Sequence, residues 1–183
     1  MRLKHRLLLL LTFIFIAVPG LNGAIAASPA AGLESFELEE ATIASIQEQM
    51  EEGELTAEEL VHYYLDRIDA YDQQGPSINS IITLNEDAVE EAIALDEERE
   101  ISGPRSPLHG IPIIVKDNFD MEGMATSAGC LCLRDSIAAD DAFQVKKLKE
   151  AGAIILAKSN LHEFAFGITT ESSLGGQTLN PYN

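Results

Sequence analysis

The chain has 183 residues, which is enough to bury a hydrophobic core, and its 12 basic and 30 acidic residues give a formal net charge of -18. A field of that sign disfavours nucleic acids and anionic membrane surfaces, which proteins bind through clustered Lys and Arg. We therefore expect no nucleic-acid partner.

Residues 1–27 have the order of a secretory signal peptide. Three basic residues precede an apolar run, and small residues follow: Arg2, Lys4, Arg6, then Leu7 to Val18, then Ala24 to Ala26. The run is shorter than the roughly 18 to 20 residues that a membrane-spanning helix needs. We expect cleavage near Ala26 or Ala27, a secreted or periplasmic product, and no membrane attachment after cleavage.

The section after the signal peptide is predicted to be helical and acidic. Residues 28–54 are predicted to be a linker followed by a first helix, which starts at Thr42 and ends at Gly53. Thr56 to Glu59 has the form of a capping box, which predicts a second helix reaching about Tyr71. A strand at Ile78–Leu84 and a third helix from Asn85 towards Arg99 are predicted next.

The chain changes character after the loop at residues 102–107, because short apolar runs then alternate with glycine-rich turns. The runs at Ile111–Val115 and Ala153–Ala157 are typical of buried strands, and Asp140–Glu150 has the pattern of a helix. Strand, helix and strand in this order indicate an α/β protein.

The two cysteines, Cys130 and Cys132, are separated by one residue. Neighbours this close rarely reach disulfide geometry, and a second pair or histidines suited to a zinc site do not accompany them. We expect two small, buried or half-buried thiols and no metal site.

A lysine that ends a hydrophobic strand is the first candidate for chemistry. Lys116 directly follows Ile113, Ile114 and Val115. Burial lowers the pKa of a lysine, so a desolvated amine in this place could be neutral and act as a base. The alternative is a strand-end lysine that extends into solvent and has no chemical role.

Four blocks of sequence together resemble the amidase-signature family in order and in spacing. The resemblance runs from about Leu55 to the last residue, and its blocks are Pro107–Asn118, Thr126–Gly129, Ala151–Asn160 with Glu163–Ala165, and Asn180–Asn183. It implies an amidase-signature fold, in which a mixed β-sheet core is flanked by helices, with residues 55–183 as the incomplete N-terminal part of the amidase domain.

The resemblance also implies the chemistry of the family. A serine nucleophile attacks a carboxamide, and a lysine accepts the proton through a second serine held on a cis peptide bond. Lys116 matches the family's lysine, and the family uses neither a metal nor an organic cofactor. Both catalytic serines are expected beyond Asn183, because Ser172 and Ser173 precede the position of the family's serine-rich loop.

Other residues have supporting roles under the resemblance. Asp117 and Asn118 could orient Lys116 or could simply form a turn. The loop Thr126, Ser127, Ala128 and Gly129 could line the substrate pocket, or could be a plain small-residue loop. His109 and His162 are not spaced as metal ligands and are expected to be structural.

The sequence thus predicts hydrolysis of a small-molecule or peptide amide by a protein of which this chain supplies the lysine. By itself the chain is expected to be inactive, because it lacks the serines. Two alternatives stay open, namely a truncated fragment without catalytic function and an exported α/β module that binds a solute.

Overall fold

The computed structural model describes residues 38–182. The predicted signal peptide, most of the linker after it and Asn183 lie outside the described residues. Among residues 38–182, no helix combines the length and the apolar character needed to cross a membrane.

Three helices form the N-terminal part. Helix α1 (Ile43–Glu52) begins at a capping box in which Thr42 and Ser45 exchange hydrogen bonds, and it ends at Gly53 in the left-handed conformation. Helix α2 (Ala57–Arg67) begins at the predicted capping box of Thr56 and Glu59 and continues as the π-helical turn η1 (Ile68–Gln73). Helix α3 is Ala88–Ser102. The three predicted helices are therefore confirmed.

A mixed sheet lies at the centre of the molecule. Its strands are β1 (Ile81–Leu84), β2 (Pro112–Lys116) and β3 (Ile154–Ser159), in the order β1-β3-β2. Strand β3 is antiparallel to β1 and parallel to β2. The prediction of an α/β fold with a mixed sheet core flanked by helices is confirmed.

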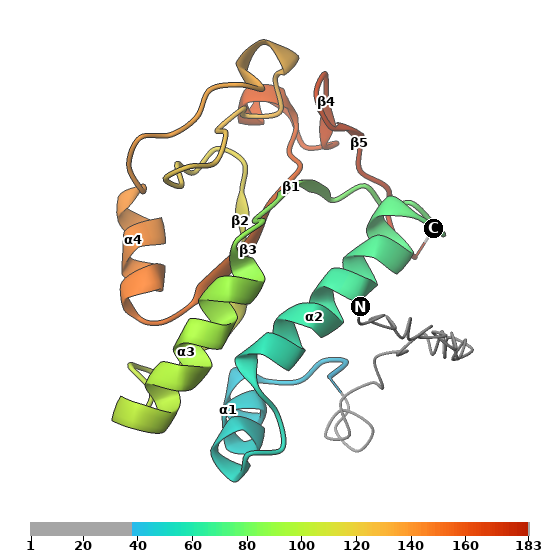
Figure 1. Cartoon of the computed structure of the whole chain (residues 1–183). Coiled ribbons are helices and arrows are strands. Elements are labelled where there is room, and N and C mark those ends of the chain that lie inside the picture. Colours follow the sequence, from blue (N-terminus) through green and yellow to red (C-terminus); the bar gives the residue numbers. More distant parts are fainter. Residues whose placement is uncertain (1–37, 183) are drawn as a thin grey trace, which may run out of the picture.

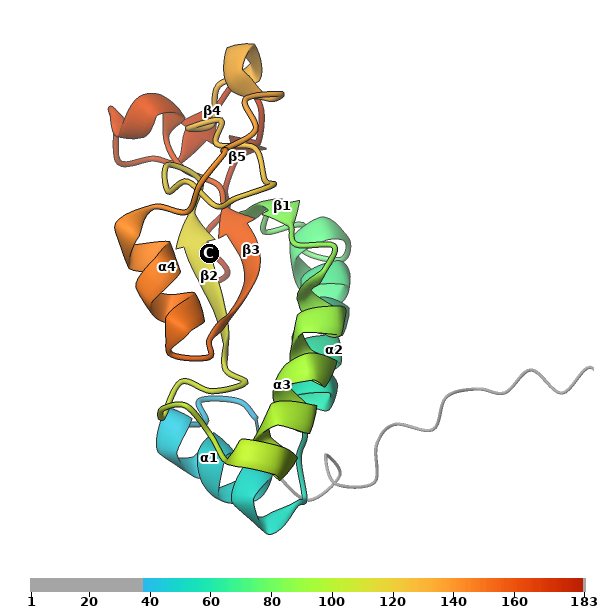
Figure 2. The ribbon, with the colours of Figure 1, turned by 60° about the vertical axis from the view of Figure 1, so that its left-hand side comes forward.

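Helices cover both faces of this sheet (Figures 1 and 2). Helices α2 and α3 pack on one face, in a core that contains Leu60 and Leu156, and α1, at one end of this helix pair (Figure 2), adds Met50 to the same core. Helix α4 (Phe143–Glu150) packs on the other face through Val145, against Ile155. Strand β3 supplies side chains to both cores, so it is the most deeply buried element of the described chain.

The remaining elements are short and gather beyond the carboxyl ends of β2 and β3 (Figure 2). They are the helical turns η2 (Leu131–Leu133) and η3 (Glu163–Ala165) and a two-stranded ribbon of β4 (Glu171–Ser172) and β5 (Gly176–Gln177). Loops at this end of a sheet are where α/β proteins commonly build their sites.

Candidate active site

Lys116 is the last residue of β2, at the end of the sheet where the loops gather. Its side chain is exposed, and its ammonium group forms no ion pair with residues 38–182. The desolvation expected from the preceding apolar residues is thus not supplied by the described chain, because Ile114 is itself exposed and Ile113 is only half buried. The sequence pattern predicted the end of a strand correctly but overestimated how far the strand buries this lysine.

Asp117 connects the end of β2 to the loop at residues 125–129. Its side chain is 1% exposed, and its Oδ2 accepts hydrogen bonds from the Ser127 hydroxyl and from the Gly129 amide, at 3.4 Å in the second case. The Ala128 amide donates to the Asp117 carbonyl oxygen at 3.0 Å. The structure therefore brings Asp117 and the predicted pocket loop together, although 10 residues separate Asp117 from Ser127.

Thr126 and Asn118, two other residues of the predicted site, differ in their relation to this cluster. The Thr126 hydroxyl is near the same cluster and donates to the Phe119 carbonyl oxygen at 3.3 Å. Asn118 is exposed and makes no side-chain hydrogen bond with residues 38–182, so its side chain takes no part in the hydrogen-bonded cluster around Asp117. The turn after β2 is closed instead by the Phe119 amide, which donates to the Lys116 carbonyl oxygen at 3.0 Å.

A second lysine, Lys158 on β3, is the residue that sequence reasoning missed. Its side chain is fully buried, and its Nζ donates to the Ala125 carbonyl oxygen at 2.6 Å and to Thr126 Oγ1 at 2.9 Å. The same Nζ lies 3.2 Å from Asp117 Oδ1. Burial lowers the pKa of Lys158, and the nearby Asp117 carboxylate opposes that change.

A signal for Lys158 was present in the sequence. It follows Ile154–Ala157, which is an apolar run of the same kind as the one before Lys116. The central position of β3 in the sheet is what buries Lys158, whereas β2 lies at the sheet edge among the described residues. The pattern alone does not distinguish a central strand from an edge strand.

Ser172 and Ser173 already have partners in the protein. The Ser172 hydroxyl donates to Asn160 Oδ1 at 3.0 Å and accepts from the Gly175 amide at 2.9 Å. Ser173 Oγ accepts from the Leu131 amide, and its own amide donates to Glu163, whose pKa is lowered by hydrogen bonds from Ser173. These contacts hold the β4–β5 ribbon in place.

The two candidate histidines have structural surroundings. His109 is fully buried, its Nε2 lies 2.9 Å from the Leu95 carbonyl oxygen, and its Nδ1 accepts from the Arg105 amide. His162 Nδ1 lies 3.2 Å from the Thr169 hydroxyl. Within residues 38–182, no three His, Cys, Asp or Glu side chains come together in a group that could hold a metal ion.

The cysteine prediction was wrong in one respect. Cys130 and Cys132 form a disulfide directly after Gly129, with their Cα atoms 5.2 Å apart. That separation lies in the ordinary range for disulfides, and the helical turn η2 produces it by curling the chain between the two residues. A spacing of one residue is compatible with a disulfide when the chain turns this tightly.

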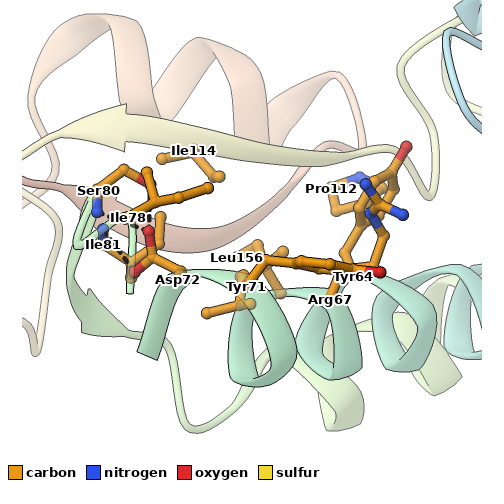
Figure 3. Close-up of a pocket in the computed structure, with 11 residues that line it drawn as sticks. Tyr64, Arg67, Tyr71, Asp72, Ile78, Ser80, Ile81, Pro112, Ile114 and Leu156 are labelled. Atoms are coloured by element: carbon orange, nitrogen blue, oxygen red, sulfur yellow. Dashed lines mark hydrogen bonds between the residues drawn. The ribbon is translucent and has the colours of Figure 1, made fainter. Parts of the chain in front are cut away.

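An apolar cavity of about 320 Å³ lies on the opposite side of the sheet from α4 (Figure 3). Tyr64 and Tyr71 from α2 and η1 face Ile114 and Pro112 of β2 across it. At one end, the Asp72 carboxylate accepts hydrogen bonds from Ser80 and from the Ile81 amide. None of the predicted site residues lines this cavity.

The family model for Amidase matches residues 59–183, which is more than half of the chain. The chain therefore belongs to the amidase family. A protein of Schizosaccharomyces pombe whose name marks it as an amidase is 44% identical, over 82% of this chain and 26% of that protein. A glutamyl-tRNA(Gln) amidotransferase subunit of Lawsonia intracellularis is 43% identical, over 78% of this chain and 28% of its own length.

Solved structures agree with this assignment. The native peptide amidase of Stenotrophomonas maltophilia superimposes with a TM-score of 0.75 at 44% identity, over 79% of this chain and 30% of that protein. An amidase family protein of Bacillus anthracis gives a TM-score of 0.74 at 40% identity, over 83% of this chain and 33% of that one. The chain spans between a quarter and a third of the length of these relatives.

Proposed function

We propose that this protein takes part in the hydrolysis of a carboxamide and that Lys116 is the proton acceptor of the reaction. The observation that carries the proposal is the position of Lys116. It ends β2 beside a loop that Asp117 holds by hydrogen bonds, in a chain that is 44% identical to a peptide amidase. The names of the relatives support an amide as the substrate, and the predicted signal peptide supports an exported protein.

The proposed reaction uses two serines that lie outside residues 1–183. A serine hydroxyl attacks the amide carbonyl and loses its proton to a bridging serine, which passes a proton to the neutral Lys116 amine. When the tetrahedral intermediate collapses, the C–N bond breaks and the proton returns to the leaving ammonia or amine. Water then hydrolyses the acyl-serine ester and releases the carboxylate.

The environment of Lys116 has to make this role possible. Burial is the usual way in which a protein makes a lysine able to act as a base, and Lys116 is exposed among the described residues. We therefore propose that the segment carrying the two serines covers the Lys116 amine and removes it from water. The isolated chain is then inactive for two reasons, since it lacks the serines and leaves its lysine hydrated.

The test uses the protein extended by its natural downstream sequence. Hydrolysis of simple amides and peptide amides is measured as the ammonia or amine released. Arginine keeps the charge of Lys116 but cannot be deprotonated in proteins. Lys116→Arg should therefore lower kcat/KM about as much as Lys116→Ala, by several powers of ten as is usual for a lost member of a nucleophile–base set.

The matched control is Lys146→Arg, because Lys146 is an exposed lysine of α4 away from the site. It should leave the rate unchanged. Retention of most of the activity by Lys116→Arg would show that the lysine is a positive anchor, and the proposed mechanism would have to be withdrawn. Turnover by the chain of residues 28–183 alone would contradict the placement of the serines.

A further inference from the structure

Lys158 is the only fully buried lysine among residues 38–182. Lysine is almost never fully buried unless it is paired, because removing its charge from water is costly. Its Nζ donates hydrogen bonds to the Ala125 carbonyl and the Thr126 hydroxyl, and it forms an ion pair with Asp117 Oδ1, a buried oxygen that accepts no hydrogen bond from the described residues. The Asp117 carboxylate supplies the opposite charge that a buried ammonium group needs, so the surroundings of Lys158 suit a charged lysine.

The contacts of Lys158 join two segments that the sequence separates. Asp117 directly follows Lys116 on β2, while Ala125 and Thr126 open the loop that continues to Gly129. Asp117 uses its other carboxylate oxygen to hold Ser127 and Gly129 in that same loop. The buried ammonium group thus holds Asp117 and the start of the loop, and Asp117 in turn holds the end of the loop.

Stability alone is a weak explanation for such a pair. Replacing a buried ion pair with apolar residues of similar volume is often neutral or stabilising, whereas removing one partner leaves an uncompensated buried charge. What an ion pair provides and a packed apolar pair does not is a fixed direction for its hydrogen-bonding groups. Here the directed groups are the Asp117 carboxylate and the Ala125 carbonyl, and Asp117 is the residue that follows Lys116.

We propose that Lys158 is a positioning residue for Lys116, acting through Asp117. It balances the negative charge of Asp117, the residue that follows Lys116, and holds the start of the loop at residues 125–129 against that residue. The effect of Lys158 on catalysis rests on the proposed role of Lys116, whereas its effect on the position of Lys116 does not. Asp120 is the other acidic residue whose charge acts on Lys158, and it contributes less than Asp117.

The experiment measures how fast the Lys116 amine of the full chain reacts with acetic anhydride, by mass spectrometry at about pH 9, relative to Lys146 in the same sample. In Lys158→Met, the carboxylate of Asp117, the residue that follows Lys116, loses its counter-charge, and an unbalanced negative charge favours the unreactive ammonium form of a nearby amine. The ratio of Lys116 to Lys146 acetylation should fall about threefold or more, as expected for an unbalanced charge at short range.

Two further variants test whether the change in the acetylation ratio comes from the charge of Asp117. Asp117→Asn removes the carboxylate and leaves Lys158, so the ratio should rise or stay level. The double variant removes both charges, and its ratio should return to within about twofold of the unmodified protein. Amide hydrogen exchange should also be about tenfold faster at Ala128 and Gly129 in Lys158→Met, with exchange in α2 unchanged.

An unchanged acetylation ratio in a folded Lys158→Met chain would overturn the proposal, because a role limited to fold stability does not alter the reactivity of an exposed amine. If Lys158→Met does not fold, Lys158→Gln replaces it, since its amide can still donate to Ala125 without the charge. The measurement involves no turnover. A failed amidase assay therefore leaves this inference standing, and an unchanged acetylation ratio leaves the proposed function standing.

Discussion

Gly129 closes the loop beside Lys116, and its substitution gives a quantitative test of how tightly that loop is packed. Its φ is +75°, and a Cβ added to it would lie 2.8 Å from Ser172 Cβ and 3.3 Å from the Leu161 carbonyl oxygen. An L-residue in the left-handed region costs about 1–2 kcal/mol. Overpacking against a well-packed neighbour costs about 1–3 kcal/mol more. Gly129→Ala should therefore lower the free energy of unfolding by about 2–5 kcal/mol.

Gly123→Ala is the matched control, because Gly123 has a similar φ of +83° and nothing within 4 Å of an added Cβ. Gly123→Ala has the backbone cost alone, so its free energy of unfolding should fall by about 1–2 kcal/mol. Urea unfolding followed by circular dichroism measures both values, and an unchanged slope keeps the comparison valid. Equal losses in the two variants would show that Ser172 and Leu161 do not pack against Gly129, and the description of the loop would be refuted.

Three further outcomes are expected. Because burial holds the pKa of Lys158 below 10.5 in the folded protein, the unfolded chain binds more protons between that lowered pKa and 10.5. The free energy of unfolding should then gain a component that rises with pH in that window, and urea unfolding at several pH values should show this component lost in Lys158→Met. Iodoacetamide should label Cys130 and Cys132 of the unfolded chain only after treatment with dithiothreitol, and labelling without reductant would contradict the disulfide. Ile114 is 46% exposed on β2, which pairs only with β3 among the described residues, and an apolar strand edge of this kind favours self-association. Ile114→Lys should therefore increase the monomer fraction in size-exclusion chromatography. An unchanged elution profile would exclude this edge as the cause of self-association.

Local signals were sufficient for most of the secondary structure. Thr56 and Glu59 form the capping box that their spacing predicts, and Gly53 ends the first helix in the left-handed conformation. The strand predicted at Ile78–Leu84 begins only at Ile81, because Asn79 has a φ of 60°, outside the extended region. The sequence pattern contained the apolar residues of that strand but not the turn in front of it.

The candidate site was predictable only in part, because its contacts depend on tertiary structure. The sequence singled out Asp117 as possible support for Lys116 and Thr126–Gly129 as a possible pocket loop but predicted no contact between them, and the structure brings them into contact. The family resemblance emphasised the first of two similar lysines, Lys116, while the fold buries the second, Lys158. Burial of a charged residue depends on which strand lies in the middle of the sheet, and strand order is not a local property.

The end of β3 and the residue that follows the strand connect parts of the chain that are far apart in sequence. Lys158 reaches back more than 30 residues to Thr126, and Asn160 reaches forward to Ser172 and Thr178. Contacts of such long range form only after β2 and β3 have paired, since closing long loops costs entropy before the contacts reward it. The site is therefore expected to assemble late in folding, so that substitutions around Lys158 and Asn160 accelerate unfolding far more than they slow folding.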